Sequence, residues 1–280
     1  MTDLPGDAPG RLVFVAGLHR SGTSLVHRCL AAHPDVSGFA DTGVPEDEGQ
    51  HLQTVYPPAH RYGGAGLFGF APEAHLTETS PLATAASREQ LLREWGPHWR
   101  PGAPVRIEKS PPNLVRTRFL QALFPDAAFV AVLRHPLAVA GATRKGRRLR
   151  LTYERLVHHW VACHTILAED ASHLRRLYVV RYERFVADPD AELARIFAAL
   201  GLAPHPSGEH VRAGVNDAYF ARWRSRRNPY RAVDRRRTTA RWEADVRRFG
   251  YSLVDTAMVA DLPLPAPPEA QPAAADTNRR

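Results

Sequence analysis

The chain has 280 residues, enough for one α/β domain with a substantial core, and its 44% apolar and 24% charged residues are typical of a folded enzyme. No apolar run is long enough to span a membrane and no secretory signal peptide is recognisable, so we expect a cytoplasmic protein. The net charge of +8 favours anionic partners such as nucleotides or nucleic acid, although high arginine content also accompanies a GC-rich genome.

Strands and helices are predicted to alternate along the chain. In chain order, the pattern predicts a strand at Leu12–Ala16, a helix at Thr23–His33, an irregular region at 34–86, a helix at Glu89–Trp95, a strand at Val105–Glu108, a helix at Leu114–Leu123, a strand at Phe129–Leu133, helices at Pro136–Lys145 and Tyr153–His173, a strand at Leu177–Arg181 and a helix at Pro189–Leu200. This order predicts an α/β fold with a parallel sheet covered by helices on both faces.

We expect a single domain over residues 11–255, with disordered tails at 1–10 and 262–280. The long irregular region is expected to be functional and to shape an acceptor pocket. The two cysteines, Cys29 and Cys163, fall in apolar helical patterns, so we expect buried thiols rather than a disulfide or a metal site.

The most informative segment is residues 13–25, Val-Phe-Val-Ala-Gly-Leu-His-Arg-Ser-Gly-Thr-Ser-Leu. Gly17 and Gly22 have the spacing of a P-loop, in which backbone N–H groups and a helix N-terminus converge on an anion. Thr23 replaces the lysine of ATP- and GTP-binding loops, and the cation of this loop is Arg20. The loop therefore indicates another phosphate-bearing donor, although a glycine-rich turn can also be a simple connection.

Charged residues stand at or just after the ends of all four predicted strands, and the carboxyl ends of parallel strands form the ligand-binding edge of such a sheet. They are Arg20, Glu108-Lys109, Arg134 and Arg181-Tyr182. A nucleotide-hydrolysing P-loop protein needs a carboxylate for Mg²⁺ at a neighbouring strand end, whereas the strand at 129–133 ends in Arg134. We therefore expect a nucleotide with two separated anionic groups, bound without metal; the alternative for Arg134 is a structural bond to a helix carboxylate.

Several segments together resemble the PAPS-dependent sulfotransferases, where PAPS is 3′-phosphoadenosine 5′-phosphosulfate. Arg20–Ser24 and Arg134–Pro136 are similar to the two nucleotide-binding boxes, and the opening His19–Ser24 with Ala32–Val36 is similar to that of bacterial and tyrosylprotein sulfotransferases. Glu108–Pro111 resembles an element of carbohydrate sulfotransferases, and Arg181–Pro189 resembles the segment before the last conserved helix. The resemblance covers about residues 12–250 and implies a P-loop NTPase-like sulfotransferase fold, PAPS as the donor, and a hydroxyl acceptor on a small molecule, glycan or peptide.

The resemblance also implies residue roles. The 5′-phosphosulfate would be held by the loop residues His19, Arg20, Ser21, Gly22, Thr23 and Ser24. Lys109 would stabilise the departing phosphate, and Arg134 would pair with the 3′-phosphate. The serine that the family places eight residues after this arginine is Ala142 here, so we assign the hydroxyl role to Thr143, with Arg144 and Lys145 as substitutes.

Two further contacts to PAPS and the general base complete the expected site. Tyr182 would stack on the adenine, unless it is a core residue, and Arg227 lies where the family places a loop over the nucleotide. Aligned with the tyrosylprotein enzymes, the base falls on Asp41, with Glu48 as the second candidate and Glu46, Asp47 and His51 as rivals.

Two other functions compete with this one. A small-molecule kinase with an atypical P-loop would bind ATP with Mg²⁺. A nucleic-acid-binding protein would use the stretch 222–241, which holds nine arginines in twenty residues and can also be a solvated basic run. That function leaves the cations at the strand ends unexplained, so we expect no nucleic-acid partner.

Overall fold

The structure is a computed structural model and describes residues 10–146, 151–208, 211–225 and 229–261. The predicted tails at 1–10 and 262–280, Gly10 excepted, lie outside these residues. Five strands form one sheet, β1 (Arg11–Gly17), β2 (Val36–Gly38), β3 (Val105–Lys109), β4 (Ala128–Leu133) and β5 (Leu177–Arg181). Their spatial order is β2-β3-β1-β4-β5 and each pair is parallel, which confirms the predicted fold class.

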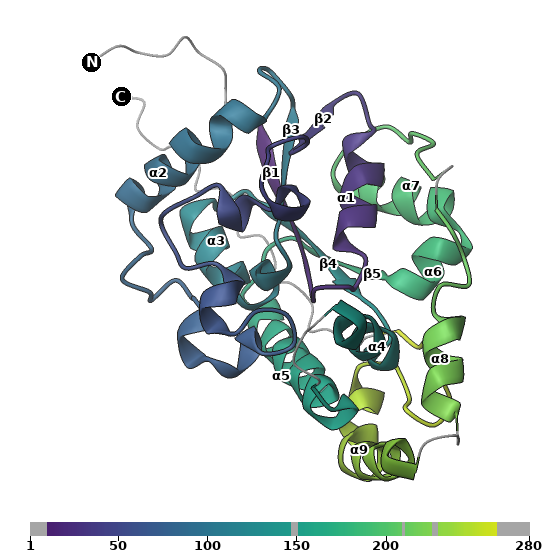
Figure 1. Ribbon diagram of the computed structural model, residues 1–280. Helices are drawn as coiled ribbons and strands as arrows, with labels where there is room; N and C mark the ends of the chain where they lie inside the picture. The colour runs from purple at the N-terminus through teal and green to yellow at the C-terminus, as the bar shows by residue number, and fades with distance from the viewer. Residues whose placement is uncertain (1–9, 147–150, 209–210, 226–228, 262–280) are drawn as a thin grey trace, which may run out of the picture.

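Helices lie on both faces of this sheet (Figure 1). They are α1 (Thr23–Ala31), α2 (Ala85–Trp95), α3 (Thr117–Leu123), α4 (Pro136–Gly146), α5 (Tyr153–Ala171), α6 (Tyr182–Ala187), α7 (Pro189–Ala199), α8 (Asp217–Arg224) and α9 (Pro229–Arg248). In Figure 1, α1, α6 and α7 lie to one side of the strands, α2 and α3 to the other, and α9 lies at the lower end of the molecule. No helix in the described ranges is both long and apolar enough to span a membrane.

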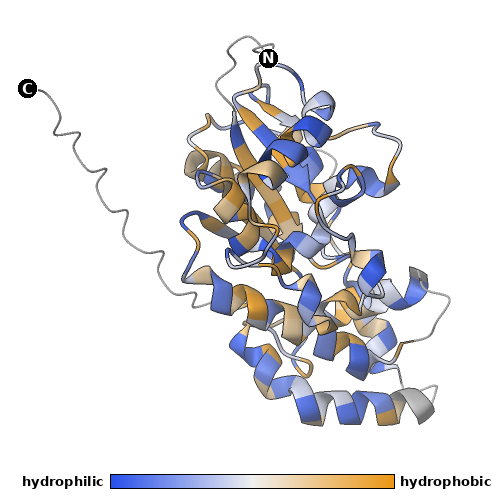
Figure 2. Ribbon diagram, turned by 90° about the vertical axis from the view of Figure 1, so that its left-hand side faces the viewer, coloured by the Kyte–Doolittle hydropathy of each residue, from blue (hydrophilic) through white to orange (hydrophobic). Residues whose placement is uncertain are grey.

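Alternate side chains of the central strand β1 enter the two faces of the sheet. Val13 and Val15 pack with α1, α6 and α7, whereas Phe14 stacks on Phe129 with ring centroids 5.6 Å apart and packs below α2 and α3. Both sets are fully buried, as expected for a strand with period-two side chains between two helical layers. Figure 2 shows the strands as a largely hydrophobic centre surrounded by helices with mixed hydropathy.

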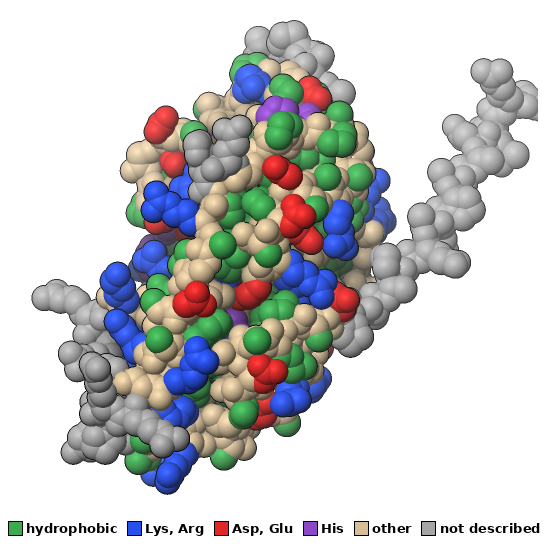
Figure 3. Space-filling view, turned by 90° about the vertical axis from the view of Figure 1, so that its right-hand side faces the viewer, with side chains coloured by type: hydrophobic (Ala, Val, Ile, Leu, Met, Phe, Trp, Pro, Cys, Tyr) green, Lys and Arg blue, Asp and Glu red, His purple; other side chains and the backbone are tan. Residues whose placement is uncertain are grey.

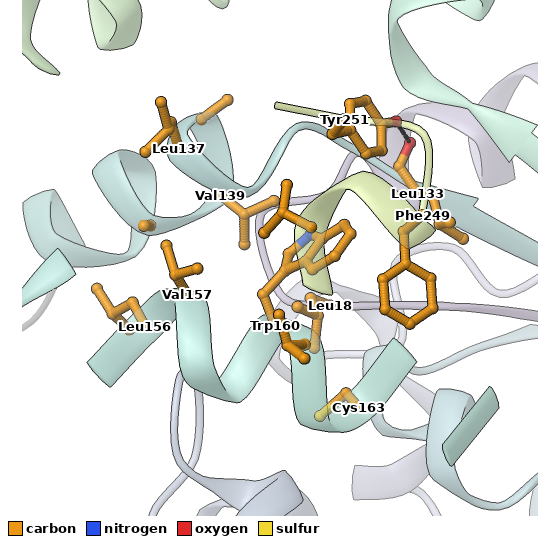
Figure 4. Close-up of a cluster of buried hydrophobic side chains, with 14 of the residues drawn as sticks. Leu18, Leu133, Leu137, Val139, Leu156, Val157, Trp160, Cys163, Phe249 and Tyr251 are labelled. Atoms are coloured by element: carbon orange, nitrogen blue, oxygen red, sulfur yellow. Dashed lines mark hydrogen bonds between the residues drawn. The ribbon is translucent and has the colours of Figure 1, made fainter. Parts of the chain in front are cut away.

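A third apolar cluster joins Ala16 of β1 and Ala131 and Leu133 of β4 to α4, α5 and the chain that follows α9 (Figure 4). Trp160 of α5 is its one fully buried tryptophan in the described chain and packs against Phe249 and Tyr251. The Trp160 indole N–H donates to the carbonyl of Arg134 at 3.0 Å, and the Tyr251 hydroxyl oxygen lies 3.2 Å from the carbonyl oxygen of Leu133. These contacts fix the turn between β4 and α4.

Several element boundaries differ from those predicted. The elements β2, α6, α8 and α9 were not predicted, and the helix predicted at 114–123 begins only at Thr117 because Pro111–Val115 forms a 3₁₀ turn. The α2 helix begins one turn early, where the Thr84 hydroxyl accepts the backbone N–H of Ser87. The expected irregular region is confirmed between β2 and α2, a fully described stretch that contains no α-helix or strand. Its regular structure consists of short 3₁₀ turns at Pro45–Asp47, Gly49–His51, Ala59–Tyr62, Phe68–Phe70 and Pro72–Ala74. Cys29 and Cys163 are buried free thiols, as predicted.

Candidate active site

The carboxyl ends of β1, β3 and β4 meet at one edge of the sheet, next to a cavity of about 370 Å³. The strand register pairs Val15 with Lys109 and Gly17 with Val132, so the residues that follow the three strands lie close together. The cavity is lined by His19, Arg20, Gly22, Thr23, Ser24, Arg28, Glu46, Glu48, Ala65, Pro111, Arg134, Ala142 and Tyr219. Most of the loop residues predicted from the sequence are therefore brought together.

The loop between β1 and α1 is shaped by two glycines. A Cβ atom at Gly17 would lie 2.8 Å from the carbonyl oxygen of Val132, so the loop can approach β4 only with glycine there. Gly22 has a φ of 104°, and Arg20 also has a positive φ of 71°. In the described chain no side chain caps the N-terminus of α1 and its first turn carries no acidic residue, so its N–H groups are available to an anion.

Arg134 lies between this loop and α8. Its Nη1 donates to the carbonyl of Arg20 at 2.9 Å, while Nε and Nη2 donate to Oδ1 of Asn216 at 2.9 and 2.7 Å. Its guanidinium also lies 4.1 Å from the centroid of the Tyr182 ring. The guanidinium is thus held at the cavity wall by neutral partners.

Lys109 is buried at the end of β3, next to residues 41–49, an acidic segment whose Glu46 and Glu48 line the cavity. Its Nζ donates to the carbonyl of Glu46 at 2.5 Å and lies 3.4 Å from Oε1 of Glu48. The other Glu48 oxygen accepts a hydrogen bond from the Gln50 amide. Burial raises the pKa of Glu48, and the neighbouring Lys109 partly opposes this effect. A carboxylate with a raised pKa beside a buried ammonium can accept a proton from a bound hydroxyl.

The acidic segment also reaches the P-loop helix. The hydroxyl of Ser24 donates to a carboxylate oxygen of Glu46 at 3.1 Å. The backbone of this segment has positive φ at Asp41, Glu46 and Asp47, at 54°, 56° and 50°. Both the N–H and the hydroxyl of Thr42 donate to Asp47, which lowers the pKa of that carboxyl and holds the turn closed.

Glu108 anchors the same segment from below. Complete burial raises the pKa of Glu108 to about 7. Two hydrogen bonds oppose this shift, one donated by the hydroxyl of Ser110 at 2.6 Å and one donated by the amide of Asn113. Ser110 in turn accepts the backbone N–H of Gln50 at 2.9 Å. A Cβ on Gly49 would lie 2.4 Å from a Glu108 oxygen, so the segment can pass over this carboxyl only with glycine.

Five of the assigned site residues in the described chain do not line the cavity, namely Ser21, Asp41, Lys109, Thr143 and Tyr182. The Asp41 side chain is exposed, and Glu48 lies on the wall instead. Thr143 is buried and its hydroxyl donates to the carbonyl of Val139 at 2.8 Å, while Ala142 faces the cavity. Ser21 is buried beside Gly17.

The aromatic residue on the cavity wall also differs from expectation. Tyr182 is buried, with its ring between the Arg134 guanidinium and Gly22, and it does not line the cavity. Tyr219 of α8 lines it instead. Arg227 lies outside the described residues, so its predicted role is not tested here.

Sequence reasoning missed Arg28, Asn216 and Tyr219. Arg28 could have been found, because it lies four residues after Ser24 on the same helix face. Asn216 and Tyr219 lie near Arg134 although they are more than eighty positions away in the sequence, so no local sequence pattern indicates them.

A larger cavity of about 640 Å³ lies between α8, α9 and the chain after α9. It is lined by Trp223, Arg224, Arg235, Arg236, Thr239, Ala240, Leu253 and Val254. None of these follows a strand, so we place the candidate active site at the smaller cavity. The arginine-rich stretch, expected as a loop over the nucleotide, forms the end of α8 and most of α9 in its described part. On the face shown in Figure 3, basic side chains are interspersed with acidic and apolar ones.

Comparisons with known proteins agree with this geometry. The model of the sulfotransferase family matches residues 12–206. The nodulation protein NoeE of Sinorhizobium fredii (strain NBRC 101917 / NGR234) is 27% identical over 284 residues, covering 90% of this chain and 64% of that protein. The protein-tyrosine sulfotransferase of Drosophila melanogaster is 26% identical over 216 residues, covering 73% of this chain and 41% of that protein. The chain thus spans less than two thirds of the length of either relative.

The fold is also similar to that of a solved structure. Sulfotransferase STF1 from Mycobacterium tuberculosis H37Rv superimposes with a TM-score of 0.54 at 16% identity, covering 83% of this chain and 77% of that chain. The predicted P-loop-like sulfotransferase fold is therefore confirmed.

Proposed function

Because the chain belongs to the sulfotransferase family, we propose that it transfers a sulfuryl group from PAPS to an acceptor hydroxyl. The observation that carries the proposal is the cavity beside the P-loop, to which one segment contributes Arg20 and the hydroxyls of Thr23 and Ser24 and another contributes Arg134. PAPS has the matching pair of anionic groups, a 5′-phosphosulfate and a 3′-phosphate.

The residues present fit this donor. The uncapped N-terminus of α1, with Arg20, Thr23 and Ser24, would hold the 5′-phosphosulfate. Arg134 would pair with the 3′-phosphate, and Tyr219 would lie against the nucleoside. The kinase alternative is less favoured, because Arg134 directly follows β4, where a magnesium-binding P-loop protein carries a carboxylate. The same residues support binding without a metal.

The bound donor supplies an electrophilic sulfur with a phosphate leaving group. During transfer the acceptor oxygen bonds to sulfur, the bond from sulfur to the 5′-phosphate oxygen breaks, and the hydroxyl proton passes to a base. We assign the base to Glu48, since it lines the cavity and burial favours its protonated form. Lys109 would stabilise the charge that develops on the phosphate, and its pairing with Glu48 couples the two groups.

The acceptor is a hydroxyl of a small molecule, glycan or peptide. The name of the Drosophila relative states that protein tyrosine is its acceptor, so tyrosine peptides belong in the first set of substrates. The two buried free thiols support a reducing compartment, and we propose the cytoplasm as the location.

Radiolabelled PAPS tests this function directly. We expect the protein to bind PAPS and to transfer label to a hydroxyl acceptor from a panel of tyrosine peptides, oligosaccharides and phenols. Glu48→Gln should abolish transfer and keep PAPS binding, whereas Glu89→Gln, at an exposed carboxylate of α2, should behave as wild type. A protein that binds neither PAPS nor its product would contradict the proposal.

A further inference from the structure

Arg134 and Glu183 do not pair directly, because the amide of Asn216 lies between them. Oδ1 of Asn216 accepts from Nε and Nη2 of Arg134, and its Nδ2 donates to Oε1 of Glu183 at 2.7 Å. Asn216 is buried and immediately precedes α8. Arg134 after β4, Asn216 before α8 and Glu183 of α6 thus form one chain of hydrogen bonds.

The orientation of this amide follows from the chemistry of its neighbours. A guanidinium can only donate hydrogen bonds, and an ionised carboxylate can only accept them. A carboxamide has one group of each kind, so its oxygen must face Arg134 and its nitrogen must face Glu183. No other orientation satisfies both partners.

Glu183 is itself held in place. Its Oε1 also accepts the backbone N–H of His135 at 2.9 Å, and its Oε2 accepts the hydroxyl of Tyr251 at 2.9 Å. The carboxylate therefore cannot move toward the guanidinium without losing these bonds. Because the Asn216 amide lies between them, no carboxylate of the described residues pairs directly with Arg134, whose positive charge stays on the cavity wall.

We propose that Asn216 is a positioning residue, whose neutral amide aims the guanidinium of Arg134 at the 3′-phosphate and separates it from Glu183. This inference rests on the proposed function, since it takes the nucleotide to be the ligand of Arg134. With Asp at position 216, a carboxylate would pair with the guanidinium and repel Glu183. With Ser, the bridge to Glu183 would be lost without a new charge.

The test compares two nucleotides that differ only in the 3′-phosphate, adenosine 3′,5′-bisphosphate and adenosine 5′-monophosphate. Calorimetric titration of wild type, Asn216→Asp and Asn216→Ser gives the ratio of the two affinities for each protein. We expect this ratio to fall at least about tenfold in both variants, with monophosphate affinity unchanged. Gln121→Ala is the matched control, because Gln121 also bridges two groups through its amide but lies away from the cavity.

Each outcome has a defined meaning. A ratio equal to that of wild type in both variants would overturn the inference. An equal loss of affinity for both nucleotides would also overturn it, because it indicates a merely structural role. The Ser variant keeps the test valid if the Asp variant does not fold. Wild-type protein without preference for the bisphosphate would instead contradict the proposed function, so the two failures are distinguishable.

Discussion

Nζ of Lys109 lies 3.4 Å from Oε1 of Glu48, and both side chains are buried where β3 meets the acidic segment of the cavity. Removing one member of such a pair destabilises the folded protein, because the other charge is left buried and uncompensated. In the proposed reaction, one member receives the acceptor proton and the other stabilises the leaving phosphate. The pair therefore links the stability of this segment to the chemistry.

Lys109→Met should lower kcat by about 100-fold or more, because it removes the cation that stabilises the departing phosphate. The affinity for adenosine 3′,5′-bisphosphate should change little, because Arg20, the N-terminus of α1 and Arg134 are proposed to hold the two phosphates, and Lys109 acts mainly on the charge of the transition state. Steady-state kinetics and calorimetry check the two parts. Normal kcat with weakened nucleotide binding would assign Lys109 to binding instead.

The buried pair also predicts a stability effect. Lys109→Met should be less stable than the double variant Lys109→Met with Glu48→Gln, because only the single variant leaves a lone buried carboxyl. Denaturant unfolding at pH 8 measures the difference. A double variant less stable than the single one would mean that the pair contributes no such coupling.

Glu108 predicts a pH dependence of stability. Its pKa is about 7 in the folded protein and about 4.5 as the reference value, so the folded state binds the proton more tightly. The resulting stabilisation is fully present below pH 4.5, decreases between pH 4.5 and 7, and is absent above that range. Relative to Glu108→Gln, the wild type should lose about 2–3 kcal/mol between pH 5 and pH 8. Urea unfolding of both proteins at both pH values measures this, and a constant difference would contradict the elevated pKa.

Arg134→Ala should weaken binding of adenosine 3′,5′-bisphosphate by about 10- to 100-fold, the usual value of a lost charge-assisted contact. Binding of adenosine 5′-monophosphate should stay close to wild type. Arg93→Ala, at an exposed position of α2, is the control. Equal weakening for both nucleotides would place the 3′-phosphate elsewhere.

Glu46→Gln should tighten binding of the same bisphosphate by about 3- to 10-fold. The Glu46 carboxylate accepts a hydrogen bond from Ser24 on the cavity wall, where it repels an incoming phosphate. Glutamine keeps the size and backbone preference of the side chain and removes only the charge. Titration that shows unchanged or weaker binding would mean that Glu46 does not compete with the nucleotide.

Local patterns in the sequence predicted the parts of the site that are contiguous in the chain. The run of apolar residues before Gly17 predicted β1, and the two glycines predicted the phosphate-binding loop that follows it. The cations after β3 and β4 were predicted because parallel strands place their carboxyl ends at one edge. These inferences need only periodicity and strand direction.

Contacts between distant segments were beyond such reasoning. The offset between Ala142 and Thr143 depends on the rotation of α4 about its axis, which one residue changes by about 100°. The choice between Asp41 and Glu48 depends on positive φ values that no residue pattern in this segment requires. Tyr182 ends up between Arg134 and Gly22 because tertiary packing, not local sequence, decides which aromatic residue lines the cavity.

The central claim is that this cavity binds the donor nucleotide of a sulfotransferase. Calorimetric titration with adenosine 3′,5′-bisphosphate in EDTA, compared with ATP and Mg²⁺, tests it most directly. We predict about micromolar binding of the bisphosphate in the absence of metal and much weaker binding of ATP. Binding of ATP with Mg²⁺ and not of the bisphosphate would contradict the account and favour a kinase.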